Sequence, residues 1–221
     1  MNIDILCENN NNCNTYIVGN LQNVIIIDPA NDERSIKKLV NNRNVLGIFL
    51  THGHYDHFKK LHKLLKIYNV FVYMHKNAYL KLADVYSSCA VYFGCNEPLL
   101  ISKEQVCELK DGETIDFGDV KVKVIFTPGH TNCSVCLKID DVMFTGDTMF
   151  FEGVGRWDLP TASSIQLTDS INKLLKSTEI EKIISHAYLK IDYCFYPGHG
   201  ESSTCFHEIK NNSYYIRNKR G

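Results

Sequence analysis

Four of the seven residues in the segment THGHYDH carry side chains that can bind a metal ion. His52 and His54 are two residues apart, so their side chains point the same way on an extended chain. Asp56 and His57 follow where a helix is expected to begin, so they approach from another direction. Imidazole nitrogen and carboxylate oxygen without a thiolate suit zinc, iron(II) or manganese. The segment therefore predicts ligands for two metal ions rather than for one.

Three other apolar runs end in comparable sequences: VKVIF leads into TPGH, DVMF into TGD and YCFY into PGHG. Functional side chains are often carried by loops at one edge of a rigid sheet, and glycine there lets the backbone come close to an ion. The repeated pattern predicts that these strand ends meet at one metal centre. We assign His52, His54 and His130 to a first ion, Asp56, His57 and His199 to a second, and Asp147 to a bridging position between them.

These seven residues leave coordination positions that water or substrate must fill. A structural zinc site would instead close its tetrahedron with protein ligands, often cysteines. Water held between two cations has a pKa lowered towards about 7, so it supplies hydroxide at neutral pH. The pattern favours a catalytic centre with two divalent ions, zinc in the first instance, with iron or manganese as alternatives.

The remaining histidines lack neighbours with ligand character. We interpret His62, His186 and His207 as ordinary surface or core residues. His75, at the end of the run VFVYMH, is interpreted as structural for the same reason.

Cys133 and Cys136 form a C-x-x-C pair, a pattern that can indicate redox or zinc chemistry. The pair begins a predicted strand, in which residues three apart lie on opposite faces. We therefore interpret both as structural thiols, although the proximity of Cys133 to His130 leaves a modulating role open.

Hydrophobic periodicity predicts the elements that position these residues. Strands are expected at about 14–19, 23–28, 47–50, 70–74, 114–117, 120–126, 134–139, 142–145 and 191–196, and helices at about 33–42, 58–68 and 164–176. Ser163 and Gln166 have the form of a capping box before the last of these helices. Residues 84–100 and 177–190 fit no pattern. No linker rich in proline, glycine or serine divides the chain, so we predict one α/β domain over residues 1–221.

Composition and charge argue against several classes of protein. The chain has 24 lysines and arginines against 25 aspartates and glutamates, so its formal charge of -1 favours neither nucleic acid nor an anionic membrane. No apolar run approaches the roughly 18 to 20 residues that span a bilayer, and the first residues lack the basic and apolar regions of a leader. Nine scattered cysteines are typical of reduced thiols. We expect a cytoplasmic enzyme that acts on a small molecule.

The motifs THGHYDH, TPGHT, FTGDTMF and YPGHG resemble, in order and spacing, those of the metallo-β-lactamase-fold hydrolases. The resemblance spans nearly the whole chain. It implies an αββα sandwich, in which two mixed or antiparallel sheets lie face to face between flanking helices, with a dinuclear site at one edge. It also implies the ligand roles assigned above.

Within that superfamily the chain is similar to the glyoxalase II group, the hydroxyacylglutathione hydrolases, and particularly to their short single-domain members. The similar segments are GDTMF, GVGRWDLP and GHGESSTCFHEIKNN. Arg156 and Asp158 take, by position, the places of a lysine and a tyrosine that those proteins offer to glutathione, so we assign both to substrate binding. Only 22 residues follow His199, so we expect no C-terminal helical substrate domain.

The resemblance implies hydrolysis of S-2-hydroxyacylglutathione-type thioesters, in which a metal-bridging hydroxide attacks the carbonyl. Asp56 and Asp147 would orient the hydroxide and take up its proton, which makes them the catalytic residues. One alternative is the persulfide dioxygenases, which share the fold and resemble the chain around GxGRxD at 153–158, but use one iron and oxygen. A non-catalytic binding protein ranks lower, because such a protein would be expected to have lost ligands.

Overall fold

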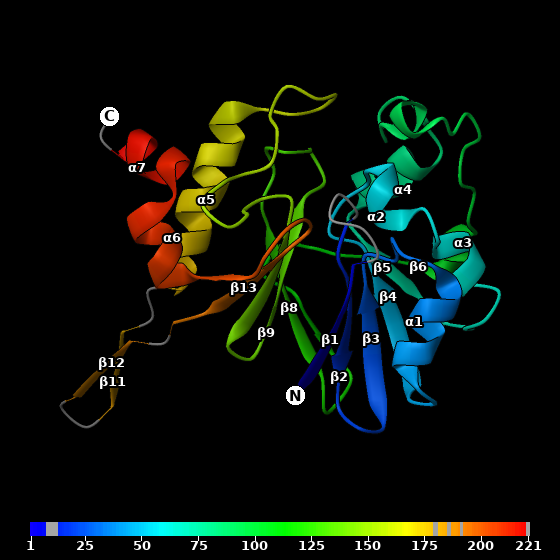
Figure 1. Cartoon of the computed structure of the whole chain (residues 1–221), viewed down its shortest axis with the longest axis horizontal. Coiled ribbons are helices and arrows are strands. Elements are labelled where there is room, and N and C mark those ends of the chain that lie inside the picture. The colour runs from blue at the N-terminus through cyan, green and yellow to red at the C-terminus, as the bar shows by residue number, and fades with distance from the viewer. Residues whose placement is uncertain (8–12, 179–180, 185–186, 191, 220–221) are drawn as a thin grey trace.

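Two six-stranded sheets lie face to face in the computed structural model, with helices on both outer sides (Figure 1). The structure describes residues 1–7, 13–178, 181–184, 187–190 and 192–219. The first sheet has the strand order β1-β2-β3-β4-β5-β6, and the second has the order β14-β13-β10-β9-β8-β7. This arrangement confirms the αββα sandwich that the sequence predicts.

The strands of the first sheet are β1 (Asn2–Leu6), β2 (Thr15–Gly19), β3 (Asn23–Ile27), β4 (Asn44–Phe49), β5 (Val72–Met74) and β6 (Val106–Glu108). Those of the second are β7 (Thr114–Asp116), β8 (Lys121–Phe126), β9 (Val135–Ile139), β10 (Val142–Gly146), β13 (Cys194–Pro197) and β14 (Ser203–Thr204). A separate hairpin of β11 (Glu181–Ile184) and β12 (Ala187–Lys190) projects from the body of the molecule (Figure 1).

Helices cover the outer face of each sheet. On the first sheet these are α1 (Glu33–Val40), α2 (Tyr55–Phe58), α3 (Leu61–Leu64) and α4 (Lys76–Leu82), and on the second α5 (Ser164–Thr178), α6 (Cys205–Asn211) and α7 (Ser213–Lys219) (Figure 1). Two short 3-10 helices, η1 (Ala90–Phe93) and η2 (Lys103–Gln105), lie between α4 and β6. None of the helices in the described part of the chain is long and apolar enough to cross a bilayer.

Apolar side chains fill three layers, as two sheets between helices require. The layer between the sheets includes Phe49 and Phe144, both fully buried. A second layer lies between the first sheet and its helices and includes Ile36 and Leu61. The third lies between the second sheet and α5 and includes Leu167.

The strands that precede the predicted ligands end at a common edge. β8 and β10 are both antiparallel to β9, and β10 is parallel to β13, so β8, β10 and β13 run in one direction. The loop after β4 lies beside the start of β9, because the N–H of Val135 donates to the carbonyl of Thr51 (2.8 Å). The four segments THGHYDH, TPGH, TGD and PGHG therefore meet where the two sheets adjoin.

The prediction of one continuous helix over residues 58–68 is wrong. α2 ends at Phe58 and α3 begins at Leu61, and between them Lys60 has φ -107° and ψ 1°, away from helical values. The N–H of Lys60 donates to the carbonyl of Pro29 (3.0 Å), so a tertiary hydrogen bond replaces an intrahelical one. Phe58, Leu61 and Leu64 are nevertheless buried on the predicted face.

The two segments for which the sequence predicts no element contain short elements of secondary structure. Residues 84–100 contain η1, which is flanked by two residues in the left-handed region, Cys89 (φ 60°) and Gly94 (φ 71°). Residues 177–190 contain the β11–β12 hairpin. A single 3-10 turn has too few residues to show a hydrophobic period, which explains why the first segment gave no prediction.

The layer between the sheets should dominate stability. Replacing Phe144 by Ala removes a fully buried ring that packs against Tyr16 (centroids 5.0 Å apart) and Tyr196 (5.5 Å apart). We expect the free energy of unfolding, measured by urea titration, to fall by about 3 to 5 kcal/mol. Phe71→Ala is the control, because that ring is 51% exposed and its loss should cost under about 1 kcal/mol. Equal losses in both variants would contradict this assignment of the core.

Candidate metal centre

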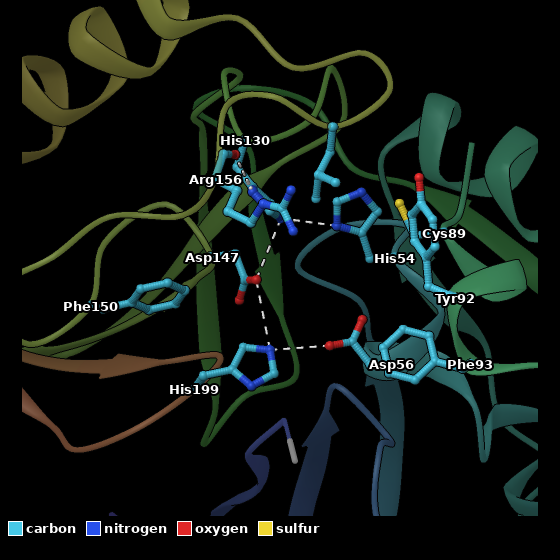
Figure 2. Close-up of a pocket in the computed structure, with 11 residues that line it drawn as sticks. His54, Asp56, Cys89, Tyr92, Phe93, His130, Asp147, Phe150, Arg156 and His199 are labelled. Atoms are coloured by element: carbon cyan, nitrogen blue, oxygen red, sulfur yellow. Dashed lines mark hydrogen bonds and ion pairs between the residues drawn. The ribbon is translucent and has the colours of Figure 1, made fainter. Parts of the chain in front are cut away.

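The seven residues predicted as ligands are gathered at the edge where the four strands end, at the bottom of a cleft. Figure 2 shows the five of them that line the cleft. His52, His54, His57 and His130 are almost fully buried, and Asp147 is 8% exposed. The side chains of Asp56 and His199 are 17% and 29% exposed and face the cleft. The structure thus brings together every residue of the predicted set.

Three imidazole nitrogens of the first group converge on one point. Nδ1 of His54 lies 3.1 Å from Nε2 of His52 and 2.9 Å from Nε2 of His130. The ligand nitrogens of a tetrahedral zinc site with bonds of about 2.0 to 2.1 Å are about 3.3 Å apart. The spacing in this group is therefore close to what one shared ion requires.

Neighbouring groups fix which nitrogen of three histidines carries the proton. The Thr51 hydroxyl donates to Oδ2 of Asp28 (2.6 Å), so its oxygen accepts from Nδ1 of His52 (3.1 Å). Nδ1 of His57 donates to the same carboxylate oxygen of Asp28 (2.9 Å). Because a neutral imidazole has one N–H, His52 must present a bare Nε2 to the site, and His57 does so once a metal displaces its second proton.

A main-chain carbonyl fixes the tautomer of His130 in the same way. Its Nδ1 donates to the carbonyl oxygen of Arg156 (2.8 Å), which leaves Nε2 unprotonated and directed at His54. A hydrogen bond to the outer ring nitrogen is the usual way in which proteins orient metal-binding histidines. The chain therefore holds the ring of His130 in the tautomer that a metal ion needs.

Several buried polar atoms in this cluster have no hydrogen-bond partner. Among the described residues these include Nε2 of His54, Nε2 of His57 and Oδ1 of Asp147. Buried polar atoms without partners cost free energy. Nε2 of His57 and Oδ1 of Asp147 face the predicted ligands, so a cation placed there would satisfy both, and the residues present fit a metal ion.

Asp147 lies between the two groups of predicted ligands. Its Oδ1 is 3.2 Å from Nε2 of His57, and its Oδ2 is 3.4 Å from Nε2 of His130 and 3.8 Å from Nε2 of His199. Oδ2 of Asp56 lies 3.1 Å from Nε2 of His199 and closes the second group. One carboxylate thus has an oxygen beside each group, which is the position assigned to it as a bridge.

The electrostatics differ between the two groups. Burial lowers the pKa of His52 and of His130, and it lowers the pKa of His54 to about 3. Burial also lowers the pKa of His57, but nearby Cys13 and carboxylates such as Asp147 outweigh it, so the net shift is upward. The first group is therefore neutral over a wide pH range, while His57 holds a proton.

For the two carboxylates and His199, burial and the neighbouring groups likewise shift the pKa in opposite directions. Burial raises the pKa of Asp147 and of Asp56, but the neighbouring imidazoles, His57 foremost and then His199, together outweigh it, so both pKa values lie below normal. For His199 burial lowers the pKa, but its hydrogen bond with Asp56 and the charges of Asp147 and Asp56 together outweigh burial and raise the net value. Both carboxylates are consequently ionised and available as ligands at neutral pH.

Glycine is required where the backbone passes the cluster. A Cβ on Gly198 would lie 2.2 Å from Oδ1 of Asp147 and 2.6 Å from the His57 ring. A Cβ on Gly155 would lie 2.0 Å from the carbonyl oxygen of Asp147 and 2.9 Å from Nδ1 of His130. Both approaches are closer than any side chain permits, so the motifs PGHG and GVGR need glycine for steric reasons.

The cleft above the cluster has a volume of about 380 Å³, within the range of small-molecule sites. Its walls are partly aromatic, with Tyr92, Phe93 and Phe150 among the lining residues (Figure 2). Arg156, which is predicted to bind substrate, lines the cleft. Asp158 lies outside that lining and forms a bidentate ion pair with Arg156, with two contacts of 2.9 Å.

Sequence reasoning missed the residues that support the ligands. Asp28 is 1% exposed and bonds both Thr51 and His57. Cys13, also buried, has its sulfur 3.2 Å from Nδ1 of His57. Asp28 ends the apolar run VIIID, so it has the same strand-end setting as the predicted ligands and could have been found by that signal. Cys13 has no such signal.

The other histidines make contacts elsewhere. His75 caps α4 by accepting from the N–H of Asn77 (3.2 Å), and Nε2 of His207 is 2.9 Å from Glu152. His62 lies on the exposed side of α3. His186 lies outside the described residues.

The C-x-x-C pair is divided between two layers of the core. Cys133 packs in the layer beside α1 to α4 and Cys136 in the layer beside α5. Neither is in a disulfide. The sulfur of Cys133 is 3.2 Å from the Thr131 hydroxyl. This placement agrees with the structural interpretation of both thiols.

Residues 9–187 match the family profile of the metallo-beta-lactamase superfamily. The chain is 31% identical over 200 residues to PksB of Bacillus subtilis, a probable polyketide biosynthesis zinc-dependent hydrolase, which covers 89% of this chain and 76% of PksB. It is 30% identical over 178 residues to a hydroxyacylglutathione hydrolase of Francisella tularensis subsp. novicida, which covers 78% of this chain and 62% of that protein.

Several solved structures are similar in fold, TTHA1623 and ETHE1 among them. TTHA1623, solved in a di-iron-bound form, has a TM-score of 0.77 and 27% identity over 97% of this chain and 100% of that one. ETHE1 from Myxococcus xanthus has a TM-score of 0.71 and 21% identity over 100% of this chain and 91% of that one. The second likeness concerns the fold alone.

Asp28 should be required for full metal affinity. Asp28→Asn removes the charge that orients His57 and replaces one carboxylate oxygen by an N–H donor. We expect affinity for zinc, measured by competition with a chromophoric chelator, to fall about 10- to 100-fold. Asp169→Asn on the exposed side of α5 is the matched control. Unchanged affinity in a folded Asp28→Asn protein would contradict the role given to Asp28.

Metal loading should depend on pH in two stages. The first group has lowered histidine pKa values, so protons compete little with a metal there at pH 6 or above. In the second group the pKa values of His57 and His199 are raised, so a metal must displace protons and binds more weakly as pH falls. Zinc titrations followed by calorimetry should give two ions per chain at pH 8 and one at about pH 6. Simultaneous loss of both ions would refute the separation.

Proposed function

The chain belongs to the metallo-beta-lactamase superfamily of metal-dependent hydrolases, and we propose that it cleaves thioesters of 2-hydroxy acids, with S-2-hydroxyacylglutathione as the reference substrate. One observation carries the proposal. The carboxylate of Asp147 lies between two groups of ligand-type side chains at the bottom of a cleft that a small molecule can enter. The hydroxyacylglutathione hydrolase relative supports the substrate class.

We propose two divalent ions as cofactors. Their ligands would be His52, His54 and His130 for one, Asp56, His57 and His199 for the other, and Asp147 for both. Zinc is the first candidate, since the relative PksB is described as zinc-dependent, and the di-iron-bound structure of TTHA1623 supports iron as the second. Manganese remains a further candidate from the ligand chemistry.

The ions, when bound, would supply a water of lowered pKa and polarise the thioester carbonyl. Asp56 is ionised and reaches the cleft, so its carboxylate can accept a proton from that water. Asp147 is ionised beside it and can hold the water in place. A thiolate leaves without strong acid assistance because thiols have pKa values near 8.5. No serine or cysteine nucleophile is needed.

Substrate contacts are proposed for Arg156 and, through it, for Asp158. The guanidinium of Arg156 faces the cleft while its main-chain carbonyl orients His130. Asp158 holds that guanidinium in one direction. We further propose that the partner is a small thioester, with neither nucleic acid nor membrane involved, and that the protein acts in the cytoplasm.

The persulfide dioxygenase alternative rests on the GxGRxD segment at 153–158 and on the common fold. Such an enzyme uses one iron, for which a single group of ligands is enough. The second group, where Oδ2 of Asp56 approaches His199 and Oδ1 of Asp147 approaches His57, has no part in that chemistry. This second group favours a dinuclear hydrolase.

The reaction is tested by thiol release from S-lactoylglutathione with zinc-loaded protein. We expect turnover that falls at least about 100-fold in Asp56→Asn, since that variant loses the proton acceptor. His54→Ala should lose turnover together with metal. Asp169→Asn, exposed on α5, is the control for both. Near-normal turnover in Asp56→Asn would remove Asp56 from the catalytic residues.

Metal content separates the hydrolase from the dioxygenase. We expect about two ions per chain by elemental analysis and no oxygen uptake with a persulfide substrate. One iron per chain, with oxygen consumed when a persulfide is added, would instead establish the dioxygenase.

A further inference from the structure

One wall of the cleft consists of exposed aromatic rings that thioester hydrolysis alone does not explain. Tyr92 is 72% exposed and Phe93 is 54% exposed, and both line the cleft on the side of His54 and Asp56 (Figure 2). Single exposed apolar residues are ordinary, but a group of large rings beside a cavity marks a binding surface. We call Tyr92 and Phe93 the aromatic wall.

The aromatic wall is fixed relative to the metal centre. Nζ of Lys81, on α4, donates to the carbonyl of Ser87 (2.9 Å), and the N–H of Tyr55 donates to the carbonyl of Ser88 (2.8 Å). The rings of Tyr55 and Phe93 also pack with centroids 5.8 Å apart. Tyr55 begins α2, the helix that carries Asp56 and His57. The backbone of this segment and the ring of Phe93 are thus held before a ligand arrives, which lowers the entropic cost of binding.

The rest of the cleft offers little to a charged ligand. Outside the metal cluster, Arg156 is the one charged side chain among the described residues that line it. Its guanidinium already makes two 2.9 Å contacts with the carboxylate of Asp158, and both side chains are about two-thirds exposed. The pair has no net charge. A glutathione moiety brings two carboxylates and would find no unpaired cation among these residues.

We propose that the preferred substrate carries an uncharged, apolar thiol group, which lies on Tyr92 and Phe93, and that these two residues determine specificity. The inference rests on the proposed thioester hydrolysis and names the class of its thiol carrier. Burial of an apolar group on the aromatic wall supplies binding, while the carboxylates of glutathione lose hydration without gaining a partner. Glutathione thioesters are then substrates, but poor ones.

Three lactoyl thioesters test this with zinc-loaded protein: those of benzyl mercaptan, N-acetylcysteamine and glutathione. All three leaving groups are alkyl thiols, so their intrinsic reactivity is similar. We expect kcat/KM to be highest for the benzyl compound, and about tenfold or more above the glutathione compound. In Phe93→Ala or Tyr92→Ala the ratio of these two values should fall about tenfold.

Tyr86→Ala is the matched control. Tyr86 is as exposed as Tyr92 and lies on the same segment, but it does not line the cleft, so its loss should leave the ratio unchanged. A ratio of the benzyl to the glutathione value that is below one, and that rises in Arg156→Gln, would overturn the proposal and assign carrier recognition to Arg156. Equal effects of Tyr86→Ala and Phe93→Ala would overturn it too.

A binding measurement keeps this proposal separate from the proposed reaction. The probe is a benzyl thioether in which a methylene group separates the carbonyl from sulfur, so that it cannot be hydrolysed. Calorimetry on the zinc-loaded protein should show affinity that falls about tenfold in Phe93→Ala but not in Tyr86→Ala. Such binding without hydrolysis of any thioester would refute the reaction and retain the aromatic wall. Absence of binding would refute the role proposed for the aromatic wall.

Discussion

The convergence of three imidazole nitrogens on one point is the constraint on which the rest of this structure depends. Nδ1 of His54 is held about 3 Å from Nε2 of His52 and from Nε2 of His130. Hydrogen bonds from the opposite side of the His52 and His130 rings leave both with a bare Nε2, so these two nitrogens cannot bond to each other and compete for the one N–H that His54 can offer. The fold thus keeps an arrangement that lowers its stability without a cation and that a cation would favour, as is common at functional sites.

Both sheets contribute to the site, so contacts across their junction matter as much as the ligands. The side chain of Asn14, beside β2, donates to the carbonyls of Pro197 and Gly200 on either side of His199. The hydroxyl of Tyr16 also donates to the carbonyl of Pro197 (2.5 Å). These bonds attach the PGHG loop of the second sheet to the first sheet. They hold the two groups of ligands in fixed positions relative to each other across the interface between the sheets.

The sequence predicts the ligand cluster well because metal ligands sit at strand ends, and strand ends are visible as apolar runs that stop at glycine or histidine. It predicts less about what surrounds them. Asp28 was missed because a lone carboxylate after a strand reads as an ordinary turn residue. The η1 segment that carries the aromatic wall was missed because a 3-10 turn between left-handed residues has no period. The break at Lys60 depends on a tertiary bond to Pro29, which no local pattern can reveal.

The hydrogen bond from His130 to Arg156 uses the main-chain carbonyl of Arg156, not its side chain. The same residue therefore serves the metal centre with one part and the cleft with another. Position 156 can in principle change its side chain while the tautomer of His130 is preserved. Selection for a new substrate could then change this side chain, next to the catalytic groups, without disturbing the metal ligands. A chain built in this way can diversify its chemistry of recognition without rebuilding its catalytic apparatus.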